Sequence, residues 1–588
     1  MKRLWSERWV ATALLALAAV AHAGEGAMST INVSDLGATP NDGKDDTAAV
    51  CAALEQCRAQ GAAGVVFPPG RYDFHAADDS HRHKVSMAAA GLRNAVIDGQ
   101  GAELVFHGIT QSFSFAGCEQ LTVRNLTIDW EKPLITVGEI VASTPAYFDV
   151  KAYDEFPVQG GEKVDSFMDY DPETQLPRRH GMDGYWSVEK TELASPGVLR
   201  VFTVRPFDMK VGFLAVLRHQ TYGFNAMSFH ACKETTVEDV TVYHTPGMAL
   251  TAGQCHNMSI RRFKVLIKPG TRRLISANAD GSHFGGCTGK IVLEDCIFDG
   301  QGDDAINAKA GLYLGVTEKV DARTVLAKHN LNMRDPRDPG DVMELTPPDT
   351  LLPYGTATVA SCEVLEDGQT HRLVFEKDLP ERLAIGDLLG NASRCANFEI
   401  RNCTFTRNRA RGILMQTRGA VVENCTFKDV TSGGIWVLAE VTHFFECIPA
   451  RDVVIRNNTF EHCNYGGPLG DAVLGAFAYL KDFAPPPEPG VFRNVVIEGN
   501  TIDQADNCAI YLAGAENVVV KDNTITGAAA MPTRPHGRNA VYIRSSRNVA
   551  ITGNRAEKSL QGEACESILA IGPGCDEGTI KVENNTGF

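Results

Sequence analysis

Three aspartates carry the strongest chemical signal in this chain of 588 residues. Asp280 is followed by Gly281, and Asp303 and Asp304 form a pair that begins 23 residues after Asp280. Carboxylates that meet at one place cannot all ionise at their ordinary pKa values, so one of them is expected to hold a proton near neutral pH. An acid and a base side by side are what hydrolysis of a glycosidic bond requires. Asp-Gly and Asp-Asp dipeptides also occur in solvated turns and in calcium sites. The surrounding sequence is therefore needed to distinguish a catalytic site from a turn or a calcium site.

The aspartates lie in a chain that repeats. An apolar strand is followed by Asn or Asp and a second short strand, and equivalent positions are 23 residues apart from Val237 to Ile260 and 22 from Ile400 to Val422. This period, with β-branched residues in alternation, predicts coils of a parallel β-helix stacked about 4.8 Å apart. Asn tolerates the left-handed backbone of tight corners and can stack in ladders. The spacing and helical segments of a leucine-rich repeat are absent. Clear copies of the unit are LTVRNLTI, TTVEDVTV, IVLEDCIF, FEIRNCTF, AVVENCTF, VVIRNNTF, VVIEGNTI and VVVKDNTI.

The amino end predicts a cap for this stack. Asp46 and Thr47 precede a helical pattern over residues 48–59, and a strand and the turn Pro68-Pro69-Gly70 follow it. A helix there would cover backbone groups that the first coil leaves unpaired. Residues 35–73 resemble the opening of pectate-lyase-like proteins, which implies a right-handed parallel β-helix in an all-β fold with an N-terminal capping helix.

Two long gaps interrupt the repeat and predict inserted modules. Val123 and Val237 are 114 residues apart, and Leu293 and Ile400 are 107 apart. Both gaps are strand-like with Gly and Pro turns, which predicts two small β-barrel or sandwich modules that flank the aspartate coils and wall a cleft. The predicted division is a signal peptide (1–23), a cap with the first coils (24–130), one insert (131–225), the coils with the aspartates (226–308), a second insert (309–397) and the last coils (398–588).

The spacing predicts that Asp280 and Asp303 lie on adjacent coils. More residues separate Asp280 from the strand before it than separate Asp303 from the strand before that residue. Residues around 268–270 are therefore expected to loop out. Neighbours in a flat strand point to opposite faces. Gly300-Gln301-Gly302 is therefore expected to form a turn or bulge that directs both Asp303 and Asp304 outward.

Composition limits the partners and the compartment. Lys2 and Arg3, an apolar run over 10–20 and Ala21-His22-Ala23 form the pattern of an export signal, which predicts cleavage near Ala23 and a periplasmic or secreted protein. No apolar run is long enough to cross a bilayer. The formal net charge of −16 disfavours nucleic acid and anionic membranes as partners.

The sixteen cysteines suggest core packing more than disulfides. Cys296, Cys403 and Cys425 occupy one position of the repeat, where a small apolar side chain stacks inside a core. No CxxC pair has a matching second pair, so no structural zinc site is predicted. The sequence predicts neither a metal nor a cofactor.

The aspartates also carry a family resemblance. TRRLISANADG and NADGSHFGGCTGKIVLEDCIFDGQGDDAIN resemble glycoside hydrolase family 110, and the likeness covers most of the chain with both inserts. It implies an inverting exo-α-1,3-galactosidase that removes terminal galactose from blood group B-type glycans. A broader resemblance to family 28 polygalacturonases implies that Asp303 is the general acid and that Asp280 and Asp304 activate water. The Arg-Ile-Lys and Gly-His-Gly strings of that family are absent, which favours a neutral sugar.

Further candidates for substrate binding surround the aspartates. His283 and Asn307 lie in the same strings, and aligning DDAI with ARGI and SGGIW places Arg411 on the next repeat coil, with Gln416 and Trp436 nearby. The imidazole is a candidate to bond a sugar hydroxyl, the guanidinium to hold an aspartate or grip substrate, and the indole to stack on galactose. Packed or ion-paired structural roles remain open for all of them.

Three other functions stay open. The same scaffold supports a polygalacturonase-like hydrolase, or a polysaccharide lyase that holds Ca²⁺ with its carboxylates. A non-catalytic solenoid that only binds glycans is the third. Branched or linear substrate preference, the disulfide state and the oligomeric state are not determined by the sequence.

Overall fold

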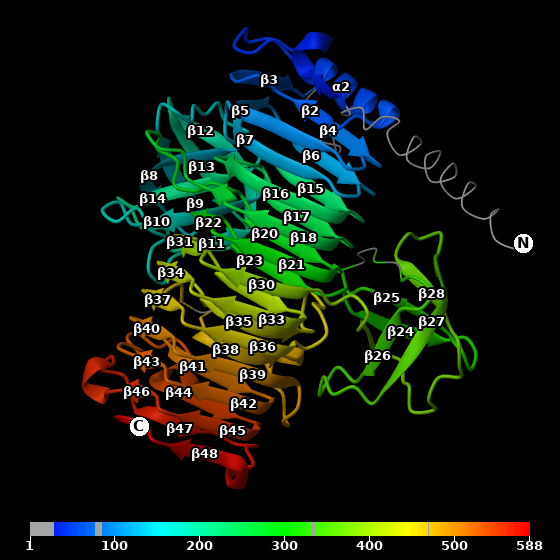
Figure 1. The fold of residues 1–588 in the computed structure, drawn as a ribbon. Coiled ribbons are helices and arrows are strands. Elements are labelled where there is room, and N and C mark those ends of the chain that lie inside the picture. The colour runs from blue at the N-terminus through cyan, green and yellow to red at the C-terminus, as the bar shows by residue number, and fades with distance from the viewer. Residues whose placement is uncertain (1–28, 77–84, 332–334, 336, 468–469) are drawn as a thin grey trace, which may run out of the picture.

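The chain folds into an elongated stack of parallel coils, shown as a computed structural model in Figure 1. The structure describes residues 29–76, 85–331, 335, 337–467 and 470–588, so the predicted signal peptide lies outside the described residues. One face of the coils is a twelve-stranded parallel sheet that carries the aspartates at its edge. Its strands are β4 (Val85–Ala90), β6 (Gln111–Ala116), β15 (Met227–His230), β17 (Leu250–Gly253), β20 (Ser282–Gly285), β23 (Ile306–Lys309), β32 (Ile413–Gln416), β35 (Ile435–Glu440), β38 (Ala472–Tyr479), β41 (Cys508–Ala513), β44 (Asn539–Arg544) and β47 (Ser567–Ile571).

The remaining coil faces form a second, 23-stranded parallel sheet. Most coils contribute two strands to it, one on each side of a corner. The strands are β1 (Thr30–Asn32), β2 (Gly64–Val66), β3 (Arg71–His75), β5 (Val96–His107), β7 (Thr122–Trp130), β16 (Lys233–Val242), β18 (His256–Arg261), β19 (Lys264–Val265), β21 (Thr288–Glu294), β22 (Ile297–Asp299), β30 (Asn397–Arg401), β31 (Thr404–Thr406), β33 (Arg418–Glu423), β34 (Thr426–Lys428), β36 (Arg451–Arg456), β37 (Thr459–Glu461), β39 (Phe492–Glu498), β40 (Thr501–Asp503), β42 (Ala515–Lys521), β43 (Thr524–Ile525), β45 (Arg547–Thr552), β46 (Arg555–Ala556) and β48 (Ile580–Glu583). The predicted all-β, parallel β-helix fold is confirmed.

The corners follow the predicted chemistry. Asn402, Asn424 and Asn457 adopt φ values of 56°, 55° and 56°, a left-handed backbone that Asn tolerates well. The next residue of each coil points inward and is buried in every coil but the last, and these inward residues stack from coil to coil. The stack runs Cys296, Cys403, Cys425, Asn458, Asn500, Asn523, Asn554 and Asn585.

The inward cysteines and phenylalanines form the coil interior. All sixteen cysteines are unpaired in the described structure, and Cys296, Cys403 and Cys425 are buried as predicted. The rings of Phe298, Phe405, Phe427 and Phe460 stack in sequence with centroids 5.5, 4.5 and 4.7 Å apart. Burial of these apolar columns supplies the main driving force for stacking the coils.

The buried asparagine ladder is expected to contribute strongly to stability. Asn500 accepts hydrogen bonds from the backbone and side-chain nitrogens of Asn458 and donates to Ile455 O and Asn523 Oδ1, all at 3.0 Å. Asn500→Ala leaves several of these buried groups unsatisfied, so we expect a loss of about 2 kcal/mol or more in urea unfolding.

A matched control for the ladder is the exposed Asn517, which bonds Asn494 and Asn548 in a parallel surface ladder. Asn517→Gly keeps its positive φ accessible and is expected to cost less than about 1 kcal/mol. Equal losses in the two variants would show that burial is not what makes the inner ladder important.

The predicted cap is present at the first coil. Helix α2 (Thr47–Gln60) packs Val50 and Leu54 against β1 to β4, and a 3₁₀ turn, η1 (Val33–Leu36), lies beside it. Asp46 occupies the N-cap position, but its carboxylate accepts from the amides of Thr39 and Asp73 instead of capping the helix. Across the described residues, no helix is long and apolar enough to cross a membrane.

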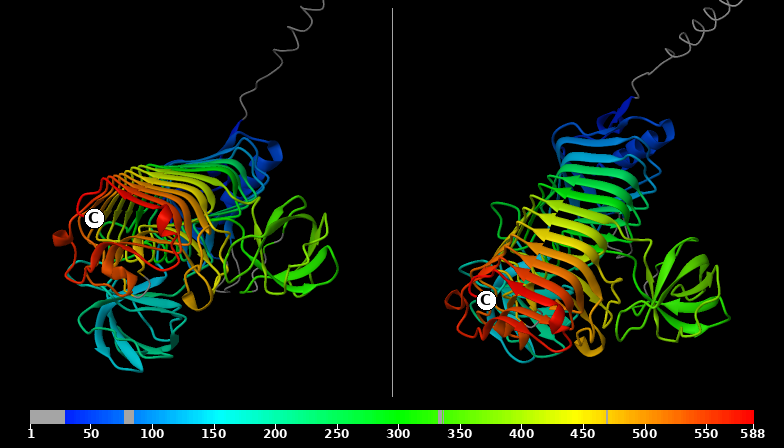
Figure 2. Two further views of the ribbon diagram at one scale, coloured as in Figure 1. Left: turned by 90° about the horizontal axis from the view of Figure 1, so that it is seen from below. Right: turned by 60° about the horizontal axis from the view of Figure 1, so that its bottom comes forward.

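Both inserts are antiparallel β modules, and Figure 2 shows them on different sides of the coil stack. The first is a seven-stranded sheet and the second is a closed six-stranded barrel. The first contains β8 (Ile135–Ser143), β9 (Tyr147–Ala152), β10 (Ser166–Tyr170), β11 (Asp183–Tyr185), β12 (Val188–Ser195), β13 (Val198–Thr203) and β14 (Leu214–Arg218). The second contains β24 (Leu314–Lys319), β25 (Thr324–Lys328), β26 (Val342–Thr346), β27 (Gly355–Val364), β28 (Thr370–Phe375) and β29 (Leu388–Asn391).

Candidate active site

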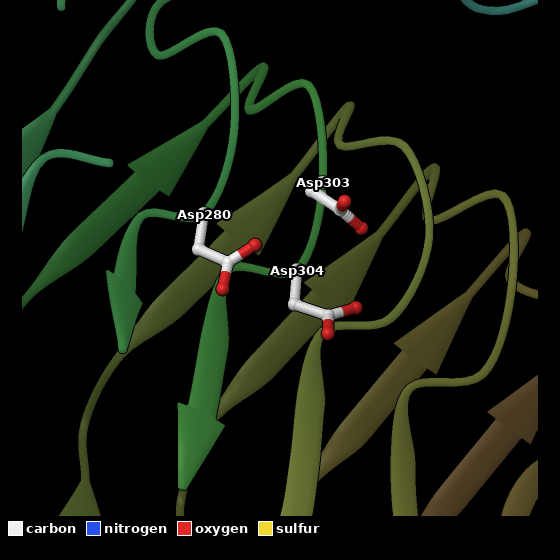
Figure 3. Close-up of side chains that lie close together, drawn as sticks. All are labelled: Asp280, Asp303 and Asp304. Atoms are coloured by element: carbon white, nitrogen blue, oxygen red, sulfur yellow. The ribbon is translucent and has the colours of Figure 1, made fainter. Parts of the chain in front are cut away.

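The three aspartates meet at one edge of the twelve-stranded sheet (Figure 3). One carboxylate oxygen of each lies within 4.8 Å of the others, and all three residues are buried. Strand β20 pairs with β23 so that Ser282 faces Ile306, and Asp280 and Asp304 therefore precede their strands by the same two residues. Residues 266–281 loop out before β20 and residues 300–305 turn before β23, as the spacing predicted.

Asp303 is the carboxylate most strongly held in its charged form. Its Oδ1 accepts from Arg409 at 2.8 Å, and its Oδ2 accepts from the hydroxyls of Tyr222 at 2.6 Å and Tyr185 at 3.1 Å. Burial opposes ionisation, but the Arg409 and Arg411 guanidinium groups and the Tyr222 hydroxyl outweigh it and lower the pKa of Asp303. Asp303 is therefore ionised in the unliganded site.

Asp280 and Asp304, in contrast, have raised pKa values that favour their protonated forms. Burial and the nearby Asp303 charge raise the pKa of Asp280 well above its usual range. Burial also raises the pKa of Asp304, against the opposing effect of Arg411. His283 Nδ1 lies 2.7 Å from Asp280 Oδ2, and burial lowers the pKa of His283 to about 3, so this imidazole is neutral. Asp280 and Asp304 are therefore the carboxylates of this cluster that favour the protonated form.

This charge distribution differs from the role assignment that the polygalacturonase resemblance implied. A general acid has to carry a proton before it can donate one. Asp303 accepts from three donors, and the further guanidinium groups of Arg411 and Arg218 are nearby; all of them favour its anion. If Asp303 is the acid during catalysis, substrate binding has to change these contacts.

Of the other predicted residues, Arg411 contacts an aspartate, whereas Asn307 and Gln416 lie further along the strands of the same sheet. Arg411 donates to Asp304 from its backbone amide at 3.0 Å and from its guanidinium at 2.8 Å. Asn307 faces His283 across the sheet, and Gln416 faces Lys309. Within the described part of the chain, Asn307 Oδ1 and both amide atoms of the buried Gln416 have no hydrogen-bond partner. Gln416 is fully buried, so it is not accessible to a substrate in this structure.

Trp436 does not have the position that a stacking platform requires. Its side chain is only 2% exposed and packs with Leu414, Phe477 and Tyr511 in a cluster on the outside of the coils. Its indole nitrogen donates to the Ala472 carbonyl at 2.8 Å. The packed role that the sequence left open for Trp436 is therefore the one that the structure shows.

The first insert supplies functional groups that the sequence did not reveal. Tyr185 and Tyr222 reach Asp303 from this module, and the fully buried Arg218 donates to the carbonyls of Asn278 and Gly302 at 2.9 and 2.7 Å. These contacts fix the turn before Asp303 against the inserted sheet. The first insert therefore packs directly against the aspartate cluster.

Lys309 and Glu446 form a second charged pair beside His283. They lie 3.1 Å apart and are both charged. Burial disfavours both charges, but the attraction between the two groups outweighs it. The pKa of Lys309 is therefore raised and the pKa of Glu446 is lowered. Lys309 is two residues after Asn307, so strand alternation alone would have placed it on the same face. Its side chain lines a pocket of about 600 Å³ with His230, His283 and Asp335.

A metal ion is the main structural alternative for the aspartate cluster. Among the described residues, these three carboxylates form the one group of His, Cys, Asp and Glu side chains close enough to hold an ion. However, Arg409 already forms an ion pair with Asp303, and Arg411 forms one with Asp304. Ca²⁺ also requires six to eight oxygen ligands. Two guanidinium groups at these distances also repel a divalent cation.

We therefore expect activity to survive metal removal. Dialysis against EDTA should change the initial rate of glycan cleavage by less than about twofold, and added Ca²⁺ should not increase it. A rate that falls with EDTA and returns with Ca²⁺ would instead support the calcium-dependent lyase.

The chain is similar to known proteins in its sequence and in its fold. The family described as "Right handed beta helix region" matches residues 388–474. The chain is 26% identical to an alpha-1,3-galactosidase A from Bacteroides fragilis, over 91% of this chain and 93% of that protein. These relatives support a glycoside hydrolase.

Two further relatives agree. An alpha-1,3-galactosidase B from Bacteroides thetaiotaomicron is 26% identical over 91% of this chain and 92% of its own, and one from Akkermansia muciniphila is 27% identical over 90% and 70%. A solved family 28 exopolygalacturonase from Yersinia enterocolitica is similar over 95% of this chain and 78% of its own, at 13% identity and a TM-score of 0.43. We infer no activity from the last of these.

Proposed function

We propose that this glycoside hydrolase is exo-acting and releases terminal α-1,3-linked galactose, as glycoside hydrolase family 110 enzymes do. The observation that carries the proposal is the convergence of Asp280, Asp303 and Asp304, in which the pKa of Asp303 is lowered and the pKa values of the other two are raised. The names of relatives that align with about nine-tenths of the chain support the linkage and the sugar. Export directed by residues 1–23 is part of the proposal.

The charges around the site support a neutral sugar. A uronate would need a free cation to bind its carboxylate. Arg409 contacts Asp183 and Asp303, Arg411 contacts Asp304, and Lys309 contacts Glu446. Because each cation already has an anionic partner, an uncharged galactose suits the site better than galacturonate.

We propose inversion, with one aspartate as general acid and another activating water. The spacing of 4.8 Å or less is closer to the roughly 5 Å typical of retaining enzymes than to the 6.5–9.5 Å typical of inverting ones. Retention, however, needs an ionised carboxylate that is free to bond to the anomeric carbon. Both oxygens of Asp303 and both of Asp304 already accept hydrogen bonds, whereas Asp280 has a raised pKa.

The proposed activity is tested by following free galactose from a panel of glycans. Linear α-1,3-galactobiose and a branched, fucosylated B-type trisaccharide are the test substrates, and α-1,4-galactobiose, α-1,6-galactobiose and polygalacturonate are the comparators. We expect galactose from at least one α-1,3 substrate and none from the comparators. Release of galacturonate, or an unsaturated product that absorbs in the ultraviolet, would contradict the proposal. So would binding of both α-1,3 substrates without turnover.

A further inference from the structure

Trp186 is a large apolar side chain in a costly position. It follows strand β11 in the first insert, its side chain is 61% exposed, and its backbone has a φ of 49°. A bulky L-residue in the left-handed region is strained, and exposing an indole forgoes the stability that its burial would give. Because neither feature helps the fold, they point to a role in binding.

The surroundings of Trp186 connect it to the catalytic centre. Its ring lies 6.1 Å from that of Tyr185 and 6.2 Å from that of Tyr222, measured between centroids. Both tyrosines donate their hydroxyls to Asp303. The exposed indole is therefore separated from a catalytic carboxylate by a single layer of aromatic rings.

A pocket continues from Trp186 across the inserted sheet. It has a volume of about 450 Å³ and lies apart from the pocket that His283 and Lys309 line. Glu162, Asp165, Glu189 and Lys190 are among its lining residues. An aromatic face beside carboxylates and ammonium groups offers stacking to the apolar face of a sugar ring and hydrogen bonds to its hydroxyls.

We propose that Trp186 and this pocket bind the leaving-group side of the glycan, the neutral sugar units to which the terminal galactose is attached. The inference rests on the proposed exo-galactosidase function. The terminal galactose is the end of its chain, so the substrate extends from the reacting bond only on the leaving-group side. An exposed platform next to Asp303 suits that side, and it makes the first insert a determinant of substrate length.

The test compares two substrates that differ only in the leaving group. A linear trisaccharide with a terminal α-1,3-galactose has two sugars to place on Trp186, whereas α-galactosyl fluoride has none. We expect Trp186→Ala to lower kcat/KM for the trisaccharide roughly tenfold or more, mainly through KM, and to change the fluoride rate by less than about twofold. Trp186→Phe should retain most of the trisaccharide activity because it keeps an aromatic face.

Val211→Ala is the matched control, since Val211 is an exposed apolar residue of the same module that does not line the pocket. It should leave both rates unchanged. Equal losses on both substrates in Trp186→Ala, or no loss on either, would overturn this inference while leaving the proposed function intact. Failure of the wild-type protein to cleave either substrate would overturn the proposed function, and this inference with it.

Discussion

Replacement of Asp280, Asp303 or Asp304 by asparagine is expected to lower galactose release from an α-1,3-galactoside by roughly 10²–10⁴-fold. Each substitution keeps the shape of the side chain but removes a group that accepts or donates a proton. Thermal unfolding should change little in Asp280→Asn, because the pKa of Asp280 is raised and its loss removes repulsion within the buried cluster. Asp303→Asn and Asp304→Asn should melt at lower temperature, because each also removes the partner of a buried guanidinium group, Arg409 or Arg411. Initial rates and melting temperatures of the three variants check both parts.

The same variants assign the roles when α-galactosyl fluoride is the substrate. Fluoride departs without protonation, so a variant that lacks only the general acid should still hydrolyse it, whereas a variant that lacks the base should not. We expect only one of the three variants to retain fluoride hydrolysis. The resemblance predicts Asp303, whereas the lowered pKa of Asp303 and the raised pKa values of its neighbours favour Asp280 or Asp304. Full activity of any variant on the α-1,3-galactoside would contradict a catalytic role for that aspartate.

The second large effect is expected at Arg409, which is nearly buried between two carboxylates. It lies 2.8 Å from Asp303 and also contacts Asp183. Arg409→Met leaves both acids without this cation, and we expect a loss of roughly 3–5 kcal/mol in the free energy of unfolding near pH 7. The magnitude is that of other buried ion pairs that lose one partner.

The pH dependence of that loss has a definite sign. Because the folded protein lowers the pKa of Asp303, its ionised form contributes stability above its unfolded pKa of about 3.9. This contribution disappears as the pH falls through the folded pKa. The difference between wild type and Arg409→Met in urea unfolding should therefore be largest near neutral pH and shrink below about pH 4.

Arg262 provides the control for Arg409. It pairs with Asp239 at 2.7 Å, but both side chains are more than two-fifths exposed. Arg262→Met should cost far less than Arg409→Met at any of these pH values, because solvent screens an exposed ion pair. A loss in Arg409→Met that is equally small, or that does not change with pH, would show that the buried cluster does not depend on this cation.

The sequence was sufficient for the scaffold and for the centre of the site because both follow the repeat. Corner residues such as Asn402 and inward residues such as Cys403 recur at fixed positions, and each position predicts a backbone conformation or a place in the core. The same register places Asp280 and Asp304 on adjacent coils and Arg411 on the next repeat coil. A repeat therefore converts spacing along the chain into proximity in space.

The remainder depended on contacts that no repeat encodes. Tyr185 and Tyr222 come from an insert whose own fold decides which side chains reach Asp303. Trp436 is buried by a cluster of side chains outside the coils. Trp186 has no signal in the sequence, since its strained backbone and its exposure are properties of the folded module.

The stereochemistry of the product tests the central claim most directly. Wild-type protein is mixed with a linear α-1,3-galactoside in an NMR tube, and the anomeric proton signals are recorded before free galactose mutarotates. An account in which aspartates activate water and protonate the leaving oxygen, with no covalent intermediate, predicts β-galactose as the first product. α-Galactose as the first product would mean retention and would contradict the mechanism proposed for Asp280, Asp303 and Asp304.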